Sequence, residues 1–222
     1  MAGLMTSRFA TVFLAAALLA GSALAAAGEP KRQLNVADQA WARSIRLQRA
    51  DLPGSGWQAR KPRNVSSSRE CRRPLGADLV ETGVAGVREF AKPGSVARSD
   101  AAVFASAAHA RTAWERARRR LAGRCLAERL RLTFSAPDAR VTMLARGEVT
   151  ADRLAPHSAV YRVRFAVTGP EGRYEGRLDS YRLARGRAVA GLELMSFTAP
   201  VEPISAAAER RVAALVAGRL ER

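Results

Sequence analysis

The chain has 222 residues, a formal net charge of +17 and 48% hydrophobic residues. This length is enough for one sizeable hydrophobic core and short for two domains. All but three of its 37 basic residues are arginine, a bias typical of a GC-rich genome rather than of one function. A surface this positive attracts anionic polymers such as phosphate-rich envelope glycopolymers, acidic lipids or nucleic acid, but it does not select among them.

The amino terminus has the three parts of a secretory signal peptide. Arg8 is its only charge, an apolar run follows from Phe9 to Ala20, and Ala23-Leu24-Ala25 supplies small residues for cleavage. The apolar run is shorter than the roughly 20 residues of a membrane span. We therefore expect residues 1–25 to be removed, which lowers the net charge from +17 to +16, with retention as an uncleaved anchor as the alternative. Residues 26–35 are then a flexible leader and 36–220 a single domain.

The signal also resembles that of a bacterial lipoprotein, with Leu19-Ala20-Gly21 followed by Ser22. Lipid attachment needs a thiol at the position that Ser22 occupies. The sequence therefore predicts an exported protein that is not lipidated and has no transmembrane span after cleavage.

Cys71 and Cys125 are the only cysteines. In an exported chain an even pair usually forms a disulfide. A bridge that closes a loop of this length stabilises a fold by on the order of 4 kcal/mol in the chain-entropy model.

The periodicity of apolar residues predicts helices and strands in a clear order. The pattern of 36–47 is helical, and the Asp51–Trp57 turn, rich in glycine, ends it, with Trp57 entering the core. The remaining expected elements are strands at 83–92 and 95–105, helices at 106–122 and 125–132, strands at 140–150, 158–168, 173–183 and 188–197, and a helix at 203–220. We therefore predict an α+β fold: a twisted antiparallel sheet of about six strands with helices packed on one face.

The helix at 106–122 carries two different faces. Trp114 and Leu121 recur with Cys125 at helical spacing and should seat this helix on the sheet. The opposite face is rich in arginine and can be a grip for phosphates or carboxylates, or only a solvated face. In the strand at 158–168, Tyr161, Val163, Phe165 and Val167 alternate with arginines that point to the other side. The candidate ligand-binding set is Arg116, Arg118, Arg119, Arg120, Arg162 and Arg164.

The sequence offers little for catalysis. No motif nominates a nucleophilic serine, and His109 and His157 do not form metal-ligand spacing with the cysteines, so we expect no catalytic residue, metal or cofactor. The arginine face lacks the exposed aromatic residues on which single-stranded nucleic acids stack, so a specific nucleic-acid partner is not expected. Acids on the strands, such as Glu148 and Asp179, leave a hydrolase open, although pairing with neighbouring arginines is their simpler role.

Several motifs together resemble a known family. They are D-L-P-G-S-G-W at 51–57, a cysteine after a loop, V-F-A-S-A-A-H-A at 103–110 and G-R-C-L at 123–126, followed by the strand meander. The chain is similar to exported actinobacterial domains that resemble the extracellular sensor domain of some serine/threonine protein kinases and related envelope lipoproteins. The resemblance implies a Mog1/PsbP-like fold with a cleft for an envelope ligand. This chain departs from the kinases in having no kinase segment and two cysteines rather than four.

Three functions are therefore compared. The first is a secreted or extracytoplasmic binding or sensor-like module of the cell envelope, without catalytic activity, that captures an anionic or amphiphilic ligand such as an envelope polymer or lipid. The second is an exported hydrolase or its accessory, which a pocket joining Glu148, Asp179 and His157 would favour. The third is a protein–protein interaction module, which an exposed apolar patch would favour. The oligomeric state is not predicted.

Overall fold

The computed structural model describes residues 28–62, 68, 71, 76–122, 125–134, 138–150, 154–170, 172–197 and 204–222, without the side chains of 121 and 122. The predicted signal peptide lies outside the described residues, and so does the side chain of Leu121. No helix among the described residues has the length and apolar character that crossing a membrane requires.

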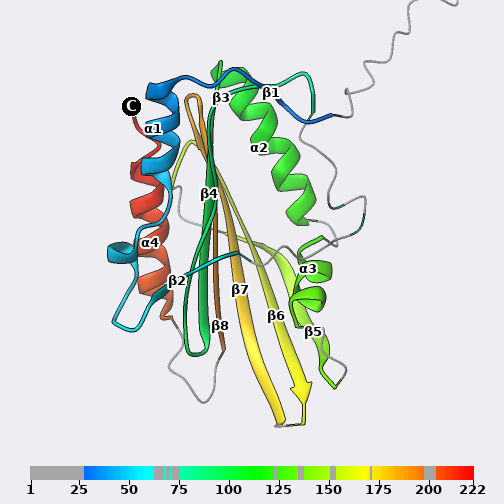
Figure 1. Ribbon diagram of the computed structural model, residues 1–222. Coiled ribbons are helices and arrows are strands. Elements are labelled where there is room, and N and C mark those ends of the chain that lie inside the picture. The colour runs from blue at the N-terminus through cyan, green and yellow to red at the C-terminus, as the bar shows by residue number, and fades with distance from the viewer. Residues whose placement is uncertain are drawn as a thin grey trace, which may run out of the picture.

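The described residues form an α+β fold (Figure 1). Most observed elements match the expected ones to within three residues. The helices are α1 (Val36–Ile45), the 3-10 turn η1 (Arg49–Asp51), α2 (Ala107–Ala122), α3 (Cys125–Thr133) and α4 (Ala206–Gly218). The strands are β1 (Lys31–Arg32), β2 (Gln58–Arg60), β3 (Val80–Lys92), β4 (Ser95–Phe104), β5 (Arg140–Val149), β6 (His157–Gly169), β7 (Gly172–Arg185) and β8 (Ala188–Phe197).

Within the described residues the sheet has eight strands rather than about six, in the order β1-β3-β4-β8-β7-β6-β5, with β2 also paired to β3. The pairing is antiparallel except between β1 and β3, which makes the sheet mixed. The two additional strands are short. β1 falls within the segment expected to be a flexible leader, and this expectation does not hold for Lys31 and Arg32, which pair with Val80 and Glu81. Assignment to the Mog1/PsbP-like folds stays a prediction.

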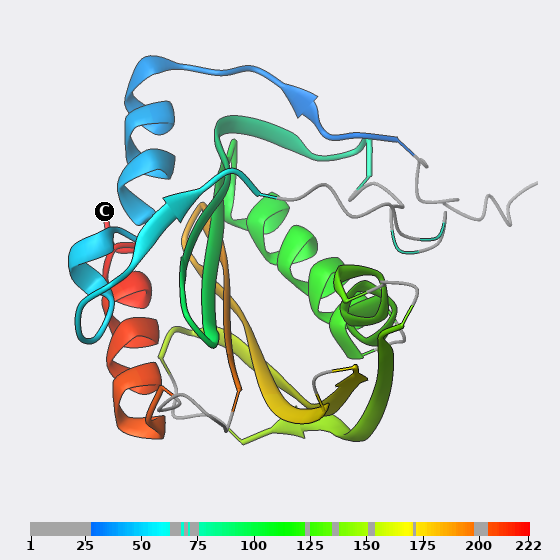
Figure 2. The ribbon, with the colours of Figure 1, turned by 60° about the horizontal axis from the view of Figure 1, so that its bottom comes forward.

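The helices cover both faces of the sheet, so the expectation that they pack on one face is wrong. α1 and α4 lie side by side on one face, and α2 and α3 lie on the other (Figures 1 and 2). Buried side chains of α1 and α4, including Ile45 and Val216, share a core cluster with Leu192 and Leu194 of β8. On the other face, Leu126 and Leu130 of α3 pack with Phe165 of β6.

The composition of β8 explains the two covered faces. Ala190, Leu192 and Leu194 point to the α1 and α4 side, whereas Met195 belongs to the cluster beneath α3. A strand that is apolar on both faces removes the most apolar surface from water when helices cover both faces, and this burial stabilises the fold. Glu193 is the exception in this run and lies on the α3 side, where it is paired with arginine.

Charged contacts fix α1 against the sheet. Asp38 is 5% exposed and accepts two hydrogen bonds from Arg187 of the β7–β8 turn, at 2.9 and 3.0 Å. These hydrogen bonds, opposed in part by burial, hold the pKa of Asp38 well below its usual value. Asp51 accepts a similar pair from Arg219 at the end of α4, so both helices are tied into the fold by buried carboxylates.

Candidate ligand-binding site

Three arginines converge beside the disulfide, between α2, α3 and β7. They are Arg120 of α2, Arg129 of α3 and Arg182 of β7, and they line a pocket of about 240 Å³ together with Cys71, Ala117, Cys125 and Leu126. We call this hollow the arginine pocket. No carboxylate belongs to its described lining. A concave site with this lining attracts anions.

The packing of α2 places Arg120 at the pocket. Ala110, Ala113 and Trp114 are buried, and the Trp114 Nε1–H donates a 3.0 Å hydrogen bond to the backbone oxygen of Arg182. Ala113, Ala117 and Arg120 follow one another at helical spacing, so Arg120 lies at the inner edge of the helix rather than on its outer face. The prediction that Trp114 seats this helix on the sheet is confirmed.

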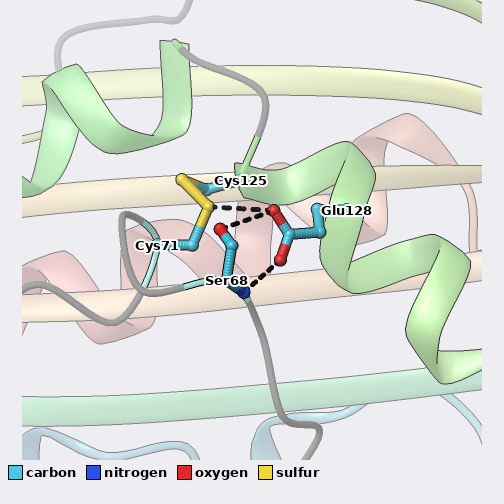
Figure 3. Close-up of a disulfide and its surroundings, with 4 residues drawn as sticks. All are labelled: Ser68, Cys71, Cys125 and Glu128. Carbon is cyan, nitrogen blue, oxygen red and sulfur yellow. Dashed lines mark hydrogen bonds between the residues drawn. A yellow bond between two sulfur atoms is a disulfide. The ribbon is translucent and has the colours of Figure 1, made fainter.

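The disulfide forms one wall of the pocket. Cys71 and Cys125 are bonded as predicted, with Cα atoms 5.3 Å apart, and Cys125 is the first residue of α3. One turn later, the Glu128 carboxylate accepts hydrogen bonds from the backbone N–H and the hydroxyl of Ser68, and lies 3.4 Å from the Cys71 Sγ (Figure 3). The segment that carries Cys71 is therefore held to α3 by a covalent bond and by Glu128.

Beneath the pocket, Glu193 positions two of the three guanidinium groups. Its carboxylate lies 2.5 Å from Arg129 Nη2 and 3.7 Å from Arg182 Nη2, and the residue is 7% exposed. Burial alone would raise the pKa of Glu193, but Arg129 and Arg182 outweigh it and hold the pKa below the ordinary value. Glu193 therefore stays ionised at neutral pH and fixes two cations at the pocket. Arg182 also donates to the backbone oxygen of Tyr181 at 3.0 Å.

The structure separates the six arginines predicted as one set. Arg116 binds Asp78 in two hydrogen bonds of 2.7 and 2.8 Å, and Arg118 pairs with Glu148 at 3.0 Å. Arg119 is 79% exposed, with Glu115 at 3.9 Å. Of the four predicted arginines of this helix, Arg120 alone belongs to the described lining of the arginine pocket. Arg162 and Arg164 lie on the opposite face of the sheet, since their neighbours Tyr161, Val163 and Phe165 face α3.

Two residues of the arginine pocket, Arg129 and Arg182, were not predicted. The sequence around each of them nevertheless indicates that its side chain lies near the sheet. Arg129 lies between Leu126 and Leu130 on a short helix whose apolar side is buried, and Arg182 lies between Tyr181 and Leu183 in a strand, which places it opposite them. Their meeting point could not be predicted, because it depends on how α3 crosses the sheet.

The acids that would favour a hydrolase do not converge. Glu148 pairs with Arg118 at the surface, and the ring of His157 packs against that of Trp114 with centroids 5.4 Å apart. Asp179 is fully buried and accepts two 2.7 Å hydrogen bonds from Arg162 on the other face of the sheet. Each of the three is therefore occupied at a different place in the fold.

Neither a family model nor a curated protein matches the sequence. Among solved structures, the extracellular domain of PknH from Mycobacterium tuberculosis is similar to this chain, with 13% sequence identity and a TM-score of 0.49. The match covers 83% of this chain and 97% of that domain. This is the class of domain that the sequence motifs predicted. A likeness at this level identifies no ligand, so the arginine pocket rests on its own geometry.

Proposed function

We propose that the protein is an extracytoplasmic binding module without catalytic activity, which captures an anionic or amphiphilic ligand of the cell envelope in the arginine pocket. The observation that carries this proposal is the convergence of Arg120, Arg129 and Arg182 on one hollow whose described lining contains no carboxylate. Guanidinium groups bind phosphate and carboxylate oxygens in pairs, and such bonds are stronger than neutral ones.

The arrangement supports capture of a ligand because it is formed before the ligand arrives. Glu193 holds Arg129 and Arg182, so these side chains lose less conformational freedom on binding than exposed arginines do. Leu126 and Ala117 add apolar surface to the same wall. An anionic group with an apolar body matches this lining better than a purely polar ion.

The proposed location rests on two features. Residues 1–25 have the pattern of a signal peptide. The chain also has the Cys71–Cys125 disulfide, and disulfides form and persist mainly in oxidising compartments outside the cytoplasm. Both support export from the cytoplasm.

The proposal is tested by titrating the exported chain with inorganic pyrophosphate, and separately with phosphatidylglycerol vesicles, at low ionic strength, where electrostatic attraction is strongest. The test variant is Arg120→Gln and the matched control is Arg119→Gln, which removes the same charge from the neighbouring, highly exposed position. We expect Arg120→Gln to weaken binding about tenfold, the effect of losing one charge-assisted hydrogen bond.

The two probes separate two sources of the anionic group. Binding of pyrophosphate would show that a phosphate group is enough for binding without a lipid, as in a soluble or polymeric phosphate. Binding of vesicles alone would identify an amphiphilic ligand. An equal loss of affinity in Arg120→Gln and Arg119→Gln would show that only net charge matters and would overturn the proposal. Absence of binding of either probe would overturn it too.

A further inference from the structure

A second pocket lies on the opposite face of the sheet, where the first turn of α4 approaches β5, β6 and β7. Its volume is about 220 Å³. We call it the α4 pocket. Its described lining combines apolar and polar residues: Val149, Thr150, Leu154, Val160, Arg162, Tyr181, Ala206, Glu209 and Arg210.

Two buried carboxyl groups lie at the α4 pocket: Glu209 lines it, and Asp179 binds Arg162, which also lines it. Asp179 is fully buried and Glu209 is 2% exposed. Arg162 donates two 2.7 Å hydrogen bonds to Asp179, and Arg177 lies 2.5 Å from Glu209 and 3.6 Å from Asp179. These contacts hold Arg162 in one orientation at the pocket, with its side chain still 37% exposed.

Tyr181 provides a polar group that the protein itself does not use. The residue is 5% exposed and lines the pocket, and its hydroxyl, which makes no hydrogen bond to a described residue, is not among the fully buried polar atoms, so it reaches the pocket space. A hydroxyl that has no protein partner and reaches a pocket hydrogen-bonds to water or to a bound molecule. Because Tyr181 lines the pocket, a bound molecule can take the place of that water and accept the hydrogen bond of the hydroxyl.

The charges at the site favour a monoanion. Arg162 and Arg177 balance Asp179 and an ionised Glu209, and Arg210 at the exposed rim adds one further positive charge. The apolar part of the lining, Val149, Leu154 and Val160, suits an aliphatic body rather than a hydrated inorganic ion. A volume of this size corresponds to roughly seven water molecules at about 30 Å³ each, which is enough for a short organic acid.

We propose that the α4 pocket is a second ligand site, which takes a small organic carboxylate between the Arg162 guanidinium and the Tyr181 hydroxyl. The site is independent of the arginine pocket, because the two lie on opposite faces of the sheet and have no described lining residue in common. The first turn of α4 faces the ligand with the positive end of the helix, which adds to the attraction.

Binding at this site should depend on pH through Glu209. Burial raises the pKa of Glu209 to about 7, with Arg177 opposing the rise and Asp179 adding to it. The charged or titratable groups around it are Arg162 from β6, Arg177, Asp179 and Tyr181 from β7, and Arg210 from α4 itself. Below this pKa Glu209 is protonated. It then does not repel a bound carboxylate, and it can donate a hydrogen bond to it, so we expect tighter binding in mild acid.

The experiment titrates the protein with sodium pentanoate at pH 6 and pH 8, followed by two-dimensional NMR, with 1-pentanol as the uncharged control probe. If the protonated form binds, its population falls from about 0.9 to about 0.1 between these pH values, and the apparent affinity falls about tenfold. Tyr181→Phe removes only the unpartnered hydroxyl and should weaken binding at pH 6 about fivefold. Arg211→Gln, next to Arg210 on the exposed side of α4, should bind as the wild type does.

Glu209→Gln should bind equally at both pH values, since it cannot ionise. Absence of saturable pentanoate binding at pH 6, equal affinity of wild type and Tyr181→Phe, or equal binding of 1-pentanol would each overturn the proposal. Arg120→Gln serves as a check between the two sites. The pentanoate affinity measured from the signals of the α4-pocket residues should be unchanged in this variant, so a failure of the arginine pocket and a failure of the α4 pocket are told apart.

Discussion

Replacement of Arg129 by Met tests whether Glu193 organises the arginine pocket. Arg129→Met keeps a long side chain on α3 but removes the main partner of a carboxylate that is 7% exposed. Breaking a buried ion pair from one side costs about 3–5 kcal/mol. Because the Arg129 side chain is 32% exposed and Arg182 remains 3.7 Å away, we expect the lower end, about 3 kcal/mol. In a domain of this size that is a fall in Tm of roughly 6–12 °C.

The pH dependence gives the same test a second readout. In the wild type the pKa of Glu193 is lowered, so its contribution to stability is present above the unfolded pKa of about 4.3 and is lost as the pH falls. In Arg129→Met the carboxylate is buried without its main partner, and its pKa rises instead. Protonation then removes the unpaired buried charge of the variant. The difference in the free energy of unfolding between wild type and variant should therefore be smaller at pH 4 than at pH 7.

Urea unfolding of the oxidised protein at both pH values measures these differences. The double variant Arg129→Met, Glu193→Gln removes the buried charge as well and should recover most of the loss. A single variant within 0.5 kcal/mol of the wild type, or a double variant less stable than the single one, would refute the role given to Glu193.

Three further perturbations are predicted. Replacing Cys71 and Cys125 by Ser should lower the free energy of unfolding by on the order of 4 kcal/mol, measured by urea unfolding. The reduced wild type should be as stable as this double variant if the loss of the bridge is the cause, and a double variant as stable as the oxidised wild type would contradict the prediction. Phe165→Ala, at a fully buried position stacked on Phe134, should cost about 3–5 kcal/mol, and a cost under 1 kcal/mol would show that the cluster beneath α3 is loosely packed. Asp38→Asn should flatten the loss of stability on acidification from about pH 4 downward, because Asp38 has a lowered pKa in the fold; an unchanged acid profile would contradict the Arg187 pairing.

Local periodicity predicted most of this fold. The alternation of Val163 and Phe165 with Arg162 and Arg164 predicted both the strand β6 and its two different faces. Period-two patterns of this kind are strong because one face is buried and the other carries charge. The short strands β1 and β2 were missed, since two or three residues contain too little pattern to distinguish a strand from a loop.

The placement of the helices was predicted wrongly, although β8 contained the signal. A run such as A-V-A-G-L-E-L-M has apolar residues at both odd and even positions, which indicates a strand covered on both sides. The lone Glu193 in that run also indicated a buried cation partner, because an unpaired carboxylate is rarely kept in an apolar strand.

The sites were predicted only in part, because they are assembled from distant segments. Arg120 was counted with the outer face of α2, but its position three residues after Ala117 brings it to the inner edge. Arg129 and Arg182 meet only through Glu193, which is 64 residues from Arg129 along the chain. The α4 pocket joins Arg162, which was predicted as a ligand residue, to Tyr181 and Glu209, which were not.

The most direct test of the arginine pocket is an NMR titration that observes the arginine Nε–H signals while inorganic pyrophosphate is added at low salt. We expect the signals of Arg120, Arg129 and Arg182 to shift together and to saturate with one affinity, whereas the signal of Arg119 moves little. Equal shifts across all exposed arginines, without saturation, would show a diffuse positive surface and contradict a built anion site.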